Sequence, residues 1–187
     1  MEKTFKQTQR NIARIVLFGP ESTGKTTLAK DLARYYNTIW VPEYLREFAR
    51  TKYNNGQELV YEDNMVIAKG QYQTEKMSLE GANKYIICDT DILQTIVYSH
   101  EYYGKVQNEL EEFVKDNDQE LYLLLEPDIP WESDVLRDRP NDRARMFKVF
   151  ESILRDFDKS YSILSGHGEE RLKNAIAHID DFFKYNR

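Results

Sequence analysis

The segment GPESTGKT at residues 19–26 constrains this chain more than any other feature of its sequence. Gly19, Gly24, Lys25 and Thr26 fit the spacing G-x-x-x-x-G-K-[ST], in which the glycines let successive backbone N–H groups face one anion. The apolar run IVLF precedes the segment, and the helical pattern GKTTLAKDLARYY overlaps its end, so the positive N-terminal end of a helix adds to the anion site. We therefore predict a phosphate-binding loop, called the P-loop below.

A nucleotide bound by such a loop also needs a lysine and a metal site. Lys25 has the position that reaches the β- and γ-phosphates, and the Thr26 hydroxyl has the position of a Mg²⁺ ligand. Asp89 follows the apolar run YIIC, where an acid would hold Mg²⁺ directly or through water; a helix cap is the alternative. The expected nucleotide contacts are Gly19, Glu21, Ser22, Thr23, Gly24, Lys25, Thr26 and Thr27, and the expected metal ligands are Thr26 and Asp89.

Short apolar runs alternate with helical patterns along the whole chain. The runs lie at residues 15–18, 38–41, 85–88, 121–125 and 161–164. Continuous apolar runs are typical of parallel strands that are covered on both faces. Between them, residues 61–80 form a long helical pattern that only Gly70 disfavours, and RLKNAIAHIDDFF closes the chain as an amphipathic helix. The pattern predicts an α/β fold with a five-stranded parallel sheet flanked by helices.

Length, charge and cysteine count exclude several classes of protein. The 187 residues predict one domain, residues 1–187, and a net charge of −6 argues against a nucleic acid partner. No apolar run approaches the roughly 20 residues that span a bilayer, so we expect no membrane partner. Cys88 is the only cysteine and is expected in the core, while the polar N-terminus lacks a signal peptide. We expect a cytoplasmic protein; its oligomeric state is not predicted.

Three classes of protein use a P-loop, and the sequence favours small-molecule kinases. The guanine-reading motif N-K-x-D of switch GTPases is absent, because Asn83-Lys84 is followed by Tyr85-Ile86, and mechanical ATPases usually need a longer chain. A kinase needs a base near the acceptor hydroxyl. Glu43, in WVPEYLRE, follows a strand and would lie beside the P-loop, so it is the candidate base; a surface acid in a turn is the alternative.

A kinase also needs a cationic lid that excludes water, and residues 126–147 are the candidate. This segment begins where a strand ends and contains Arg137, Arg139, Arg143 and Arg145 within nine positions. Planar guanidinium groups suit the oxygens of a transferring phosphoryl group. The alternative is a solvated run in which the arginines pair with Asp138 and Asp142.

Several motifs together resemble one known family. GPESTGKTTLAKDLA, VPEYLREF, YEDNMVIAKGQ, CDTDILQTIVYS, LYLLLEPDIPW and LRDRPNDRARMF are similar to the ribosylnicotinamide kinase domain of NadR-type bacterial proteins. The resemblance runs from about Arg14 to the last helix, and it implies a P-loop nucleoside and nucleotide kinase fold. It also implies ATP and Mg²⁺, nicotinamide riboside as the acceptor, and nicotinamide mononucleotide as the product. VPEYLRE is similar as well to the strand-end glutamate of deoxynucleoside kinases, which serves there as base.

The resemblance bears on individual residues as well. It favours Arg137 and Arg143 as the catalytic lid arginines, together with Lys25 and Glu43. Glu21 belongs to the family's form of the loop, so its side chain must point away from the phosphates, and Arg46 is a candidate partner.

The acceptor pocket is the part that the sequence predicts least. A cationic ring favours aromatic faces, and a Gln side chain can pair with a carboxamide. The candidate substrate contacts are Tyr44, Arg46, Tyr61, Gln71, Asp91 and Trp131. For Trp131 a buried loop anchor is an equal alternative, and for Gln71 a surface position is.

NadR-type proteins commonly carry a DNA-binding domain and an adenylyltransferase domain before the kinase, and this chain has room for neither. Neither adenylyl transfer nor repression is therefore implied. Two other functions stay open: a kinase of another nucleoside, such as a deoxynucleoside, and a sensor that hydrolyses ATP slowly without a phosphorylated product.

Overall fold

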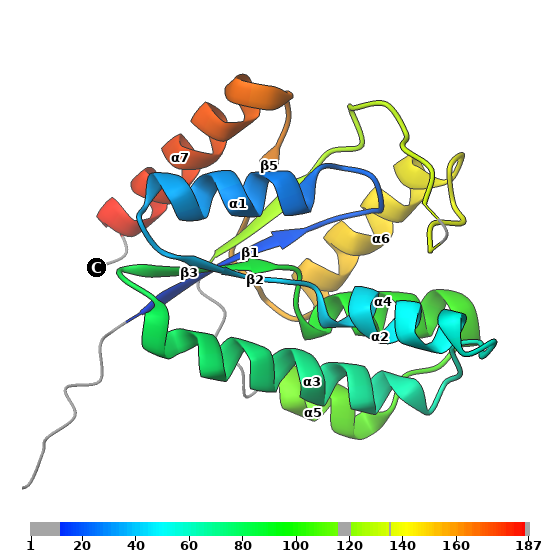
Figure 1. Ribbon diagram of the computed structural model, residues 1–187. Helices are drawn as coiled ribbons and strands as arrows, with labels where there is room; N and C mark the ends of the chain where they lie inside the picture. The colour runs from blue at the N-terminus through cyan, green and yellow to red at the C-terminus, as the bar shows by residue number, and fades with distance from the viewer. Residues whose placement is uncertain (1–11, 116–120, 135, 186–187) are drawn as a thin grey trace, which may run out of the picture.

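A computed structural model describes residues 12–115, 121–134 and 136–185 and shows one sheet covered by helices on both faces (Figure 1). All five strands are parallel and are ordered β2–β3–β1–β4–β5. They are β1 (Ala13–Phe18), β2 (Ile39–Val41), β3 (Tyr85–Asp89), β4 (Leu121–Leu125) and β5 (Tyr161–Leu164). The predicted five-stranded parallel sheet is confirmed, with each strand at one of the five apolar runs.

The central strand β1 explains why an apolar run can be continuous. Successive side chains of a strand point to opposite faces, and both faces of this sheet are covered. Ile15 and Leu17 belong to the core on one face, and Val16 and Phe18 to the core on the other; all four are fully buried.

The helices divide between the two faces of the sheet. On one face lie α1 (Lys25–Tyr35) and α7 (Gly168–Tyr185). On the other lie α3 (Asp63–Ser78), α4 (Ile92–Tyr103), α5 (Asn108–Lys115) and α6 (Arg143–Asp156), with α2 (Tyr44–Asn54) packed against α3 and a short 3₁₀ turn at Leu79–Gly81 (Figure 1). No helix in the described part of the chain is long and apolar enough to cross a membrane.

Gly70, which counted against a helix in the sequence, lies inside α3 for a steric reason. A Cβ atom at this position would lie 2.3 Å from ring carbon Cε1 of Tyr44, the first residue of α2. No real Cβ makes a contact that short, so α2 can approach α3 here only because residue 70 has no side chain.

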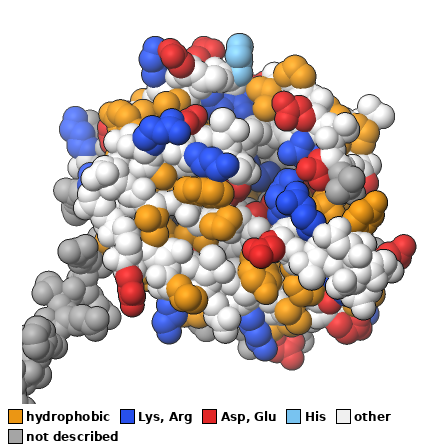
Figure 2. Space-filling model, viewed as in Figure 1, with side chains coloured by type: hydrophobic (Ala, Val, Ile, Leu, Met, Phe, Trp, Pro, Cys, Tyr) orange, Lys and Arg blue, Asp and Glu red, His pale blue; other side chains and the backbone are white. Residues whose placement is uncertain are grey.

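The carboxyl ends of the parallel strands bring four loops to one edge of the sheet. The P-loop follows β1, Glu43 follows β2, and Asp89 ends β3. Residues 126–142, here called the lid connection, join β4 to α6, and α6 takes the last five residues of the predicted lid segment 126–147. Open α/β sheets bind ligands at this edge. Lys, Arg, Asp and Glu side chains gather at the right-hand side of the face drawn in Figure 2, where these loops meet.

Candidate functional site

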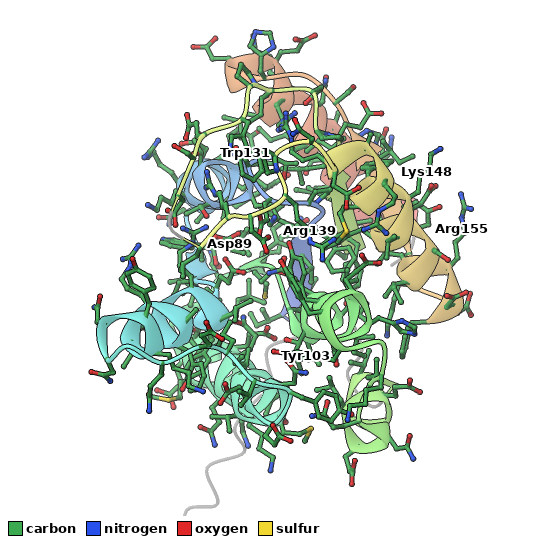
Figure 3. The ribbon with its side chains drawn as sticks, turned by 90° about the vertical axis from the view of Figure 1, so that its right-hand side faces the viewer. Asp89, Tyr103, Trp131, Arg139, Lys148 and Arg155 are labelled. Atoms are coloured by element: carbon green, nitrogen blue, oxygen red, sulfur yellow. The ribbon has the colours of Figure 1, made fainter. Side chains whose placement is uncertain are left out.

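A cavity of about 600 Å³ opens between these loops and helices α2, α3 and α4. Asp89 lines it, and Figure 3 shows Asp89 below the lid connection, which carries Trp131 and Arg139. The polar residues that line it are Glu21, Ser22, Thr23, Lys25, Thr26, Thr27, Glu43, Arg46, Asn64, Asp89, Gln94, Thr95, Glu132, Arg137 and Asp138. Its apolar and aromatic lining includes Leu59, Val60, Ile67, Tyr98, Tyr102, Tyr103, Ile129 and Leu136.

The P-loop has the local geometry that its glycines predict. Gly19 has a φ of 131°, and a Cβ there would lie 2.9 Å from the Leu125 carbonyl oxygen, so only glycine allows this approach to β4. Lys25 Nζ donates hydrogen bonds of 2.8 Å to the carbonyl oxygens of Gly19 and Pro20, and Thr23 Oγ1 donates to Pro20 O at 2.9 Å. Residues 21–27 all line the cavity, as the motif requires.

The two expected metal ligands lie in contact. Thr26 Oγ1 donates to Asp89 Oδ2 at 2.5 Å, and Asp89 Oδ1 is buried without a hydrogen-bond partner in the described part of the chain. Burial and the neighbouring Glu43 raise the Asp89 pKa to about 6. A hydroxyl and an unsatisfied carboxylate are hard oxygen donors of the kind that Mg²⁺ prefers. Residues 12–115, 121–134 and 136–185 hold no cluster of three His, Cys, Asp or Glu side chains that could bind a metal.

The two acids that flank Thr90, Asp89 and Asp91, have different surroundings. Thr90 between them has a φ of 74°, which is strained for a β-branched residue, and its neighbours are directed apart. Asp89 lines the cavity, whereas Asp91 is buried, accepts from the Leu93 N–H at 3.0 Å and caps α4. Asp91, which was predicted to contact the acceptor, therefore lies outside the cavity lining, and its second oxygen accepts from the Tyr122 hydroxyl at 2.5 Å.

Glu43 lies at the start of α2 with both carboxylate oxygens oriented. Gln94 Nε2 donates to Glu43 Oε1, while Arg46 Nε lies 3.5 Å from Glu43 Oε2. Arg46 also reaches across to the lid connection, where its Nη1 lies 3.2 Å from Asp134 Oδ2. Thr90 Oγ1 donates to Gln94 Oε1 at 2.8 Å, so the amide group of Gln94 has a fixed orientation. The carboxylate of Glu43 therefore has a defined place in the cavity.

Gln71 and Tyr44 lie behind the cavity, not in it. The Tyr44 N–H donates to Gln71 Oε1 at 2.8 Å, and Gln71 Nε2 donates to Glu75 Oε1 at 3.1 Å. Glu75 in turn forms a buried ion pair with Arg14 on β1. Gln71 is 3% exposed, so a surface position is wrong; it also lies outside the cavity lining, which does not favour the predicted carboxamide contact. Its structural effect is to hold the first turn of α2, which carries Glu43.

The remaining aromatic candidates also lie outside the lining. The Tyr61 ring packs edge-on against Tyr103 at 5.6 Å, with Lys105 Nζ 4.1 Å from its centre. The guanidinium carbon of Arg143 lies 5.8 Å from the centre of the Trp131 ring, so Trp131 belongs to the anchoring of the lid connection. Tyr98, Tyr102 and Tyr103 of α4 provide the aromatic lining that we expected from Tyr44, Tyr61 and Trp131.

The four lid arginines divide into two pairs with different surroundings. Arg137 lines the cavity, and its Nη1 donates to the Glu132 carbonyl oxygen at 2.6 Å. Arg143 lies outside the lining and donates to the carbonyl oxygens of Ser22 at 3.1 Å and Ile129 at 2.9 Å. It therefore supports the P-loop through its backbone, which is not the predicted contact with a transferring phosphoryl group.

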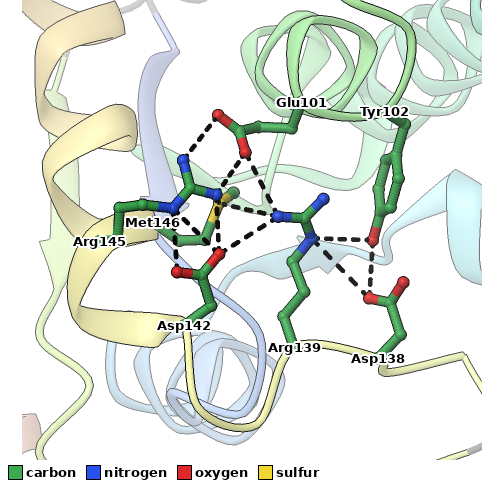
Figure 4. Close-up of polar contacts among 7 residues, drawn as sticks. All are labelled: Glu101, Tyr102, Asp138, Arg139, Asp142, Arg145 and Met146. Atoms are coloured by element: carbon green, nitrogen blue, oxygen red, sulfur yellow. Dashed lines mark hydrogen bonds and ion pairs between the residues drawn. The ribbon is translucent and has the colours of Figure 1, made fainter.

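Arg139 and Arg145 form the other pair, and their guanidinium groups point toward Glu101 on α4 (Figure 4). Both approach Glu101 and Asp142: Arg139 Nη1 lies 3.3 Å from Glu101 Oε2, and Arg145 Nη2 lies 2.5 Å from the same oxygen. The hydrogen bond from Arg145 is the main reason that the pKa of Glu101 is lowered. For these two arginines the paired, partly solvated alternative is correct.

Sequence reasoning missed the residues that α4 and α7 contribute. Gln94, Thr95 and Tyr98 share one face of α4, and the only signal was polar residues in the first turn of a helix that starts at the carboxyl edge. Arg171, in the first turn of α7, donates to the Thr23 carbonyl oxygen and pairs with Asp128. No motif marked Arg171, because its contacts join residues 43 and 148 positions apart.

Comparison with known proteins agrees with this geometry. Residues 14–171 match a family model described as AAA domain. The chain is 29% identical over 160 residues to the trifunctional NAD biosynthesis/regulator protein NadR of Salmonella typhimurium, covering 85% of this chain and 38% of that protein. It thus spans about two fifths of that curated relative.

Solved structures show the same fold. A NadR protein in complex with NR superposes with a TM-score of 0.77 at 23% identity, over 91% of this chain and 50% of that one. A deoxyadenosine kinase from M. mycoides, solved with dCMP and dCDP, superposes with a TM-score of 0.65 at 11% identity, over 90% of this chain and 99% of that one. The P-loop kinase fold expected from the sequence is therefore confirmed.

Proposed function

The chain belongs to the AAA domain family, and from that premise we propose that it transfers the γ-phosphoryl group of ATP to nicotinamide riboside. The product is nicotinamide mononucleotide, and the reaction serves NAD salvage. Support comes from the NadR relative, which is named for NAD biosynthesis, and from the NadR structure in complex with NR, the abbreviation of nicotinamide riboside. A kinase of this kind works in the cytoplasm, where ATP is available.

One observation carries the proposal: a P-loop and an oriented carboxylate, Glu43, line the same cavity. A P-loop that only hydrolysed ATP would have no need of a roomy cavity beside the γ-phosphate position. At about 600 Å³ this cavity lies in the range that holds small-molecule ligands. The aromatic side chains in its lining, Tyr98, Tyr102 and Tyr103, suit a flat ring, and its polar side chains suit a sugar.

On the nucleotide side, the N–H groups of the P-loop and Lys25 bind the β- and γ-phosphates. Thr26 and Asp89 would hold Mg²⁺, which would neutralise phosphate charge. Lys25 Nζ donates to two carbonyl oxygens of its own loop, and phosphate oxygens can replace these acceptors.

On the acceptor side, Glu43 accepts the proton of the hydroxyl that attacks the γ-phosphorus. The bond from phosphorus to the bridging oxygen of ADP breaks as the new bond from phosphorus to the acceptor oxygen forms. Gln94 and Arg46 keep the carboxylate in one orientation during the step. Arg137, on the lid connection, meets charge on the transferring group, and the lid connection itself excludes water.

A panel of nucleosides tests the proposal directly. Each is incubated with ATP, Mg²⁺ and the protein, and phosphorylated products are identified by mass spectrometry. We expect nicotinamide mononucleotide as the product with the highest kcat/KM. A higher kcat/KM for another nucleoside would reassign the acceptor, and ADP without any phosphorylated nucleoside would favour an ATP-dependent sensor.

A further inference from the structure

Glu21 belongs to the P-loop by sequence but lines the cavity on the side of the lid connection. Its Oε2 atom is buried, and no hydrogen-bond partner for it lies in residues 12–115, 121–134 or 136–185. Arg46, the partner that the sequence suggested, pairs instead with Glu43 and Asp134. Glu21 is thus a carboxylate in the cavity whose oxygen is left without a donor.

Hydrogen bonds hold the backbone on both sides of Glu21, so the backbone position of this residue is fixed. Ser22 has a φ of 54°, its Oγ accepts from the Glu132 N–H at 2.9 Å, and its carbonyl oxygen accepts from Arg143 at 3.1 Å. On the other side, the Pro20 carbonyl oxygen accepts from Thr23 Oγ1 and Lys25 Nζ. These contacts fix the point from which the Glu21 side chain enters the cavity.

The charges around Glu21 compensate its carboxylate only in part. Burial, with the neighbouring Asp138 and Glu43, raises the pKa of Glu21 to about 7 although Lys25 and Arg137 act to lower it. Leaving a buried acceptor unpaired costs about 1–3 kcal/mol, and more when it is charged. A ligand that brings a hydrogen-bond donor to Oε2 would remove this cost.

The acceptor nucleoside can bring such a hydrogen-bond donor close to Glu21, because its sugar carries hydroxyls beside the one that reacts. Glu21 and Glu43 both line the cavity, and both act electrostatically on Lys25 and on the Tyr98 hydroxyl, so the two carboxylates face the same part of the cavity. With the reacting hydroxyl at Glu43, the other hydroxyls of the same sugar are the donors closest to Glu21.

We propose that Glu21 accepts a hydrogen bond from a second sugar hydroxyl of the acceptor and thereby selects ribosyl over deoxyribosyl nucleosides. This inference rests on the proposed function and deepens it. A site built to bind a substrate hydroxyl rejects the analogue without it, because its own polar group is then left unpaired. Hydrogen bonds to charged groups contribute about 1.5–3 kcal/mol, which corresponds to roughly 10- to 150-fold in kcat/KM.

The test compares acceptors within each protein variant. Wild type and Glu21→Ala are assayed with nicotinamide riboside and with its 2′-deoxy and 3′-deoxy forms, and the ratio of kcat/KM between the acceptors is measured. This ratio does not depend on the fraction of folded enzyme. We expect wild type to prefer the ribosyl form by about 10- to 150-fold over at least one deoxy form, and Glu21→Ala to reduce this preference to within about threefold.

Glu21→Gln is the second variant if the alanine protein does not fold, since it keeps the shape of the side chain and only a neutral acceptor; its preference should fall between the other two. Glu132→Ala is the matched control, because Glu132 is another carboxylate in the lining, and its ratio should equal that of wild type. A ratio that Glu21→Ala leaves unchanged would overturn the inference. In that case an equal loss for all acceptors would assign Glu21 to supporting Arg137 or the metal.

The wild-type arm separates this inference from the proposed function. If nicotinamide riboside gives no product but another ribonucleoside does, the same ratios are measured with that nucleoside and its deoxy forms. If no nucleoside is phosphorylated, both the proposed function and the role of Glu21 are wrong.

Discussion

The nucleotide wall of the cavity, residues 19–27, wraps itself with hydrogen bonds between residues three to six positions apart. The acceptor wall, made of Glu43, Arg46, Gln94 and Tyr98, is joined by contacts that reach much farther along the chain. Gln94 and Glu43 are 51 positions apart, and Arg46 and Asp134 are 88 apart. The P-loop also receives long-range support, but that support falls on its carbonyl oxygens, as with Arg143 at Ser22.

This difference teaches how each wall can be damaged. The side chains that face phosphate on the nucleotide wall come from one contiguous segment. A substitution there should therefore affect only the contacts with the nucleotide near the substituted residue. The acceptor wall depends on how α2, α3, α4 and the lid connection pack, so a change outside the cavity can act on the acceptor. Substitutions in the nucleotide wall should therefore change the kinetics with ATP, and substitutions in the acceptor wall should change the kinetics with the acceptor.

Lys25→Ala should have the largest effect, because it removes the cation that meets the transferring phosphoryl group. An arginine finger, another cation that stabilises the transferring phosphoryl group, contributes on the order of 10³–10⁵-fold to kcat. We expect kcat to fall by at least about 10³-fold while the far-UV circular dichroism spectrum stays unchanged. Steady-state kinetics with ATP and nicotinamide riboside measures it, and a variant with near wild-type kcat would remove the P-loop from the mechanism.

Glu43→Gln should have the next largest effect and should act on the other wall. Glutamine keeps the shape of the side chain and removes the proton acceptor, a loss that typically costs about 10²–10⁴-fold in kcat. The dissociation constant of ATP, measured by calorimetry, should stay within about twofold of wild type, because Glu43 acts on the acceptor hydroxyl. If kcat falls only a few-fold, Glu43 orients the acceptor and another group takes the proton.

The sequence predicted the nucleotide wall because its geometry is a property of a short segment. Gly19 and Gly24 have the positive φ angles that the spacing implies, and Thr26 and Asp89 meet because parallel strands end at one edge. All five strands were predictable for the same reason, since burial on both faces leaves a continuous apolar run.

The acceptor wall was predictable only at Glu43 and Arg46, the two residues next to a strand end. The sequence did not reveal that Asp91 would turn inward as a helix cap while Asp89 faced the cavity, because the separation depends on the strained backbone of Thr90. Nor did it reveal that Gln71 would bond to the N–H of Tyr44, a contact set by the packing of two helices. The chemistry of Asp91 and Gln71 suggested that they contact a ligand. In the structure both side chains instead form hydrogen bonds within the protein.

The effects of substituting the four lid arginines on kcat and KM should differ according to what surrounds each side chain, although all four carry the same charge. Arg137→Ala removes a guanidinium group from the cavity, and we expect kcat to fall by about 10- to 10²-fold, as for loss of a charged hydrogen bond. Arg143→Ala should mainly raise the KM for ATP, because Arg143 supports the Ser22 carbonyl of the P-loop. Steady-state kinetics on the single variants measures both effects.

Arg139→Ala and Arg145→Ala serve as the matched controls in that series. Both arginines pair with Glu101 and Asp142 outside the cavity, and partly exposed ion pairs contribute about 0–1 kcal/mol. Their kcat values should stay within about threefold of wild type. Equal losses across all four variants would show that the arginines act only through the stability of the lid connection.

Among the variants expected to lose kcat, Gly70→Ala should have the smallest effect, and it tests whether the acceptor wall can be disturbed from outside the cavity. The added methyl would lie 2.3 Å from the Tyr44 ring, so α2 or the ring must shift. Overpacking of this kind costs about 1–3 kcal/mol of stability. Because Glu43 immediately precedes Tyr44, the same shift should lower kcat by about three- to tenfold at a temperature where the variant is folded, with the KM for ATP unchanged.

Gly56→Ala is the control for this last prediction, because Gly56 also lies on the α2 side of the molecule but has nothing within 4 Å of its Cβ position. Its φ of 68° makes alanine strained, so this variant should lose stability without losing kcat. Thermal unfolding and kinetics on both variants separate the two causes. If Gly70→Ala loses stability and keeps kcat as Gly56→Ala does, the contact between α3 and Tyr44 stabilises the fold without positioning Glu43. A fall in kcat for Gly70→Ala alone would show that a residue outside the cavity sets the geometry of the acceptor wall.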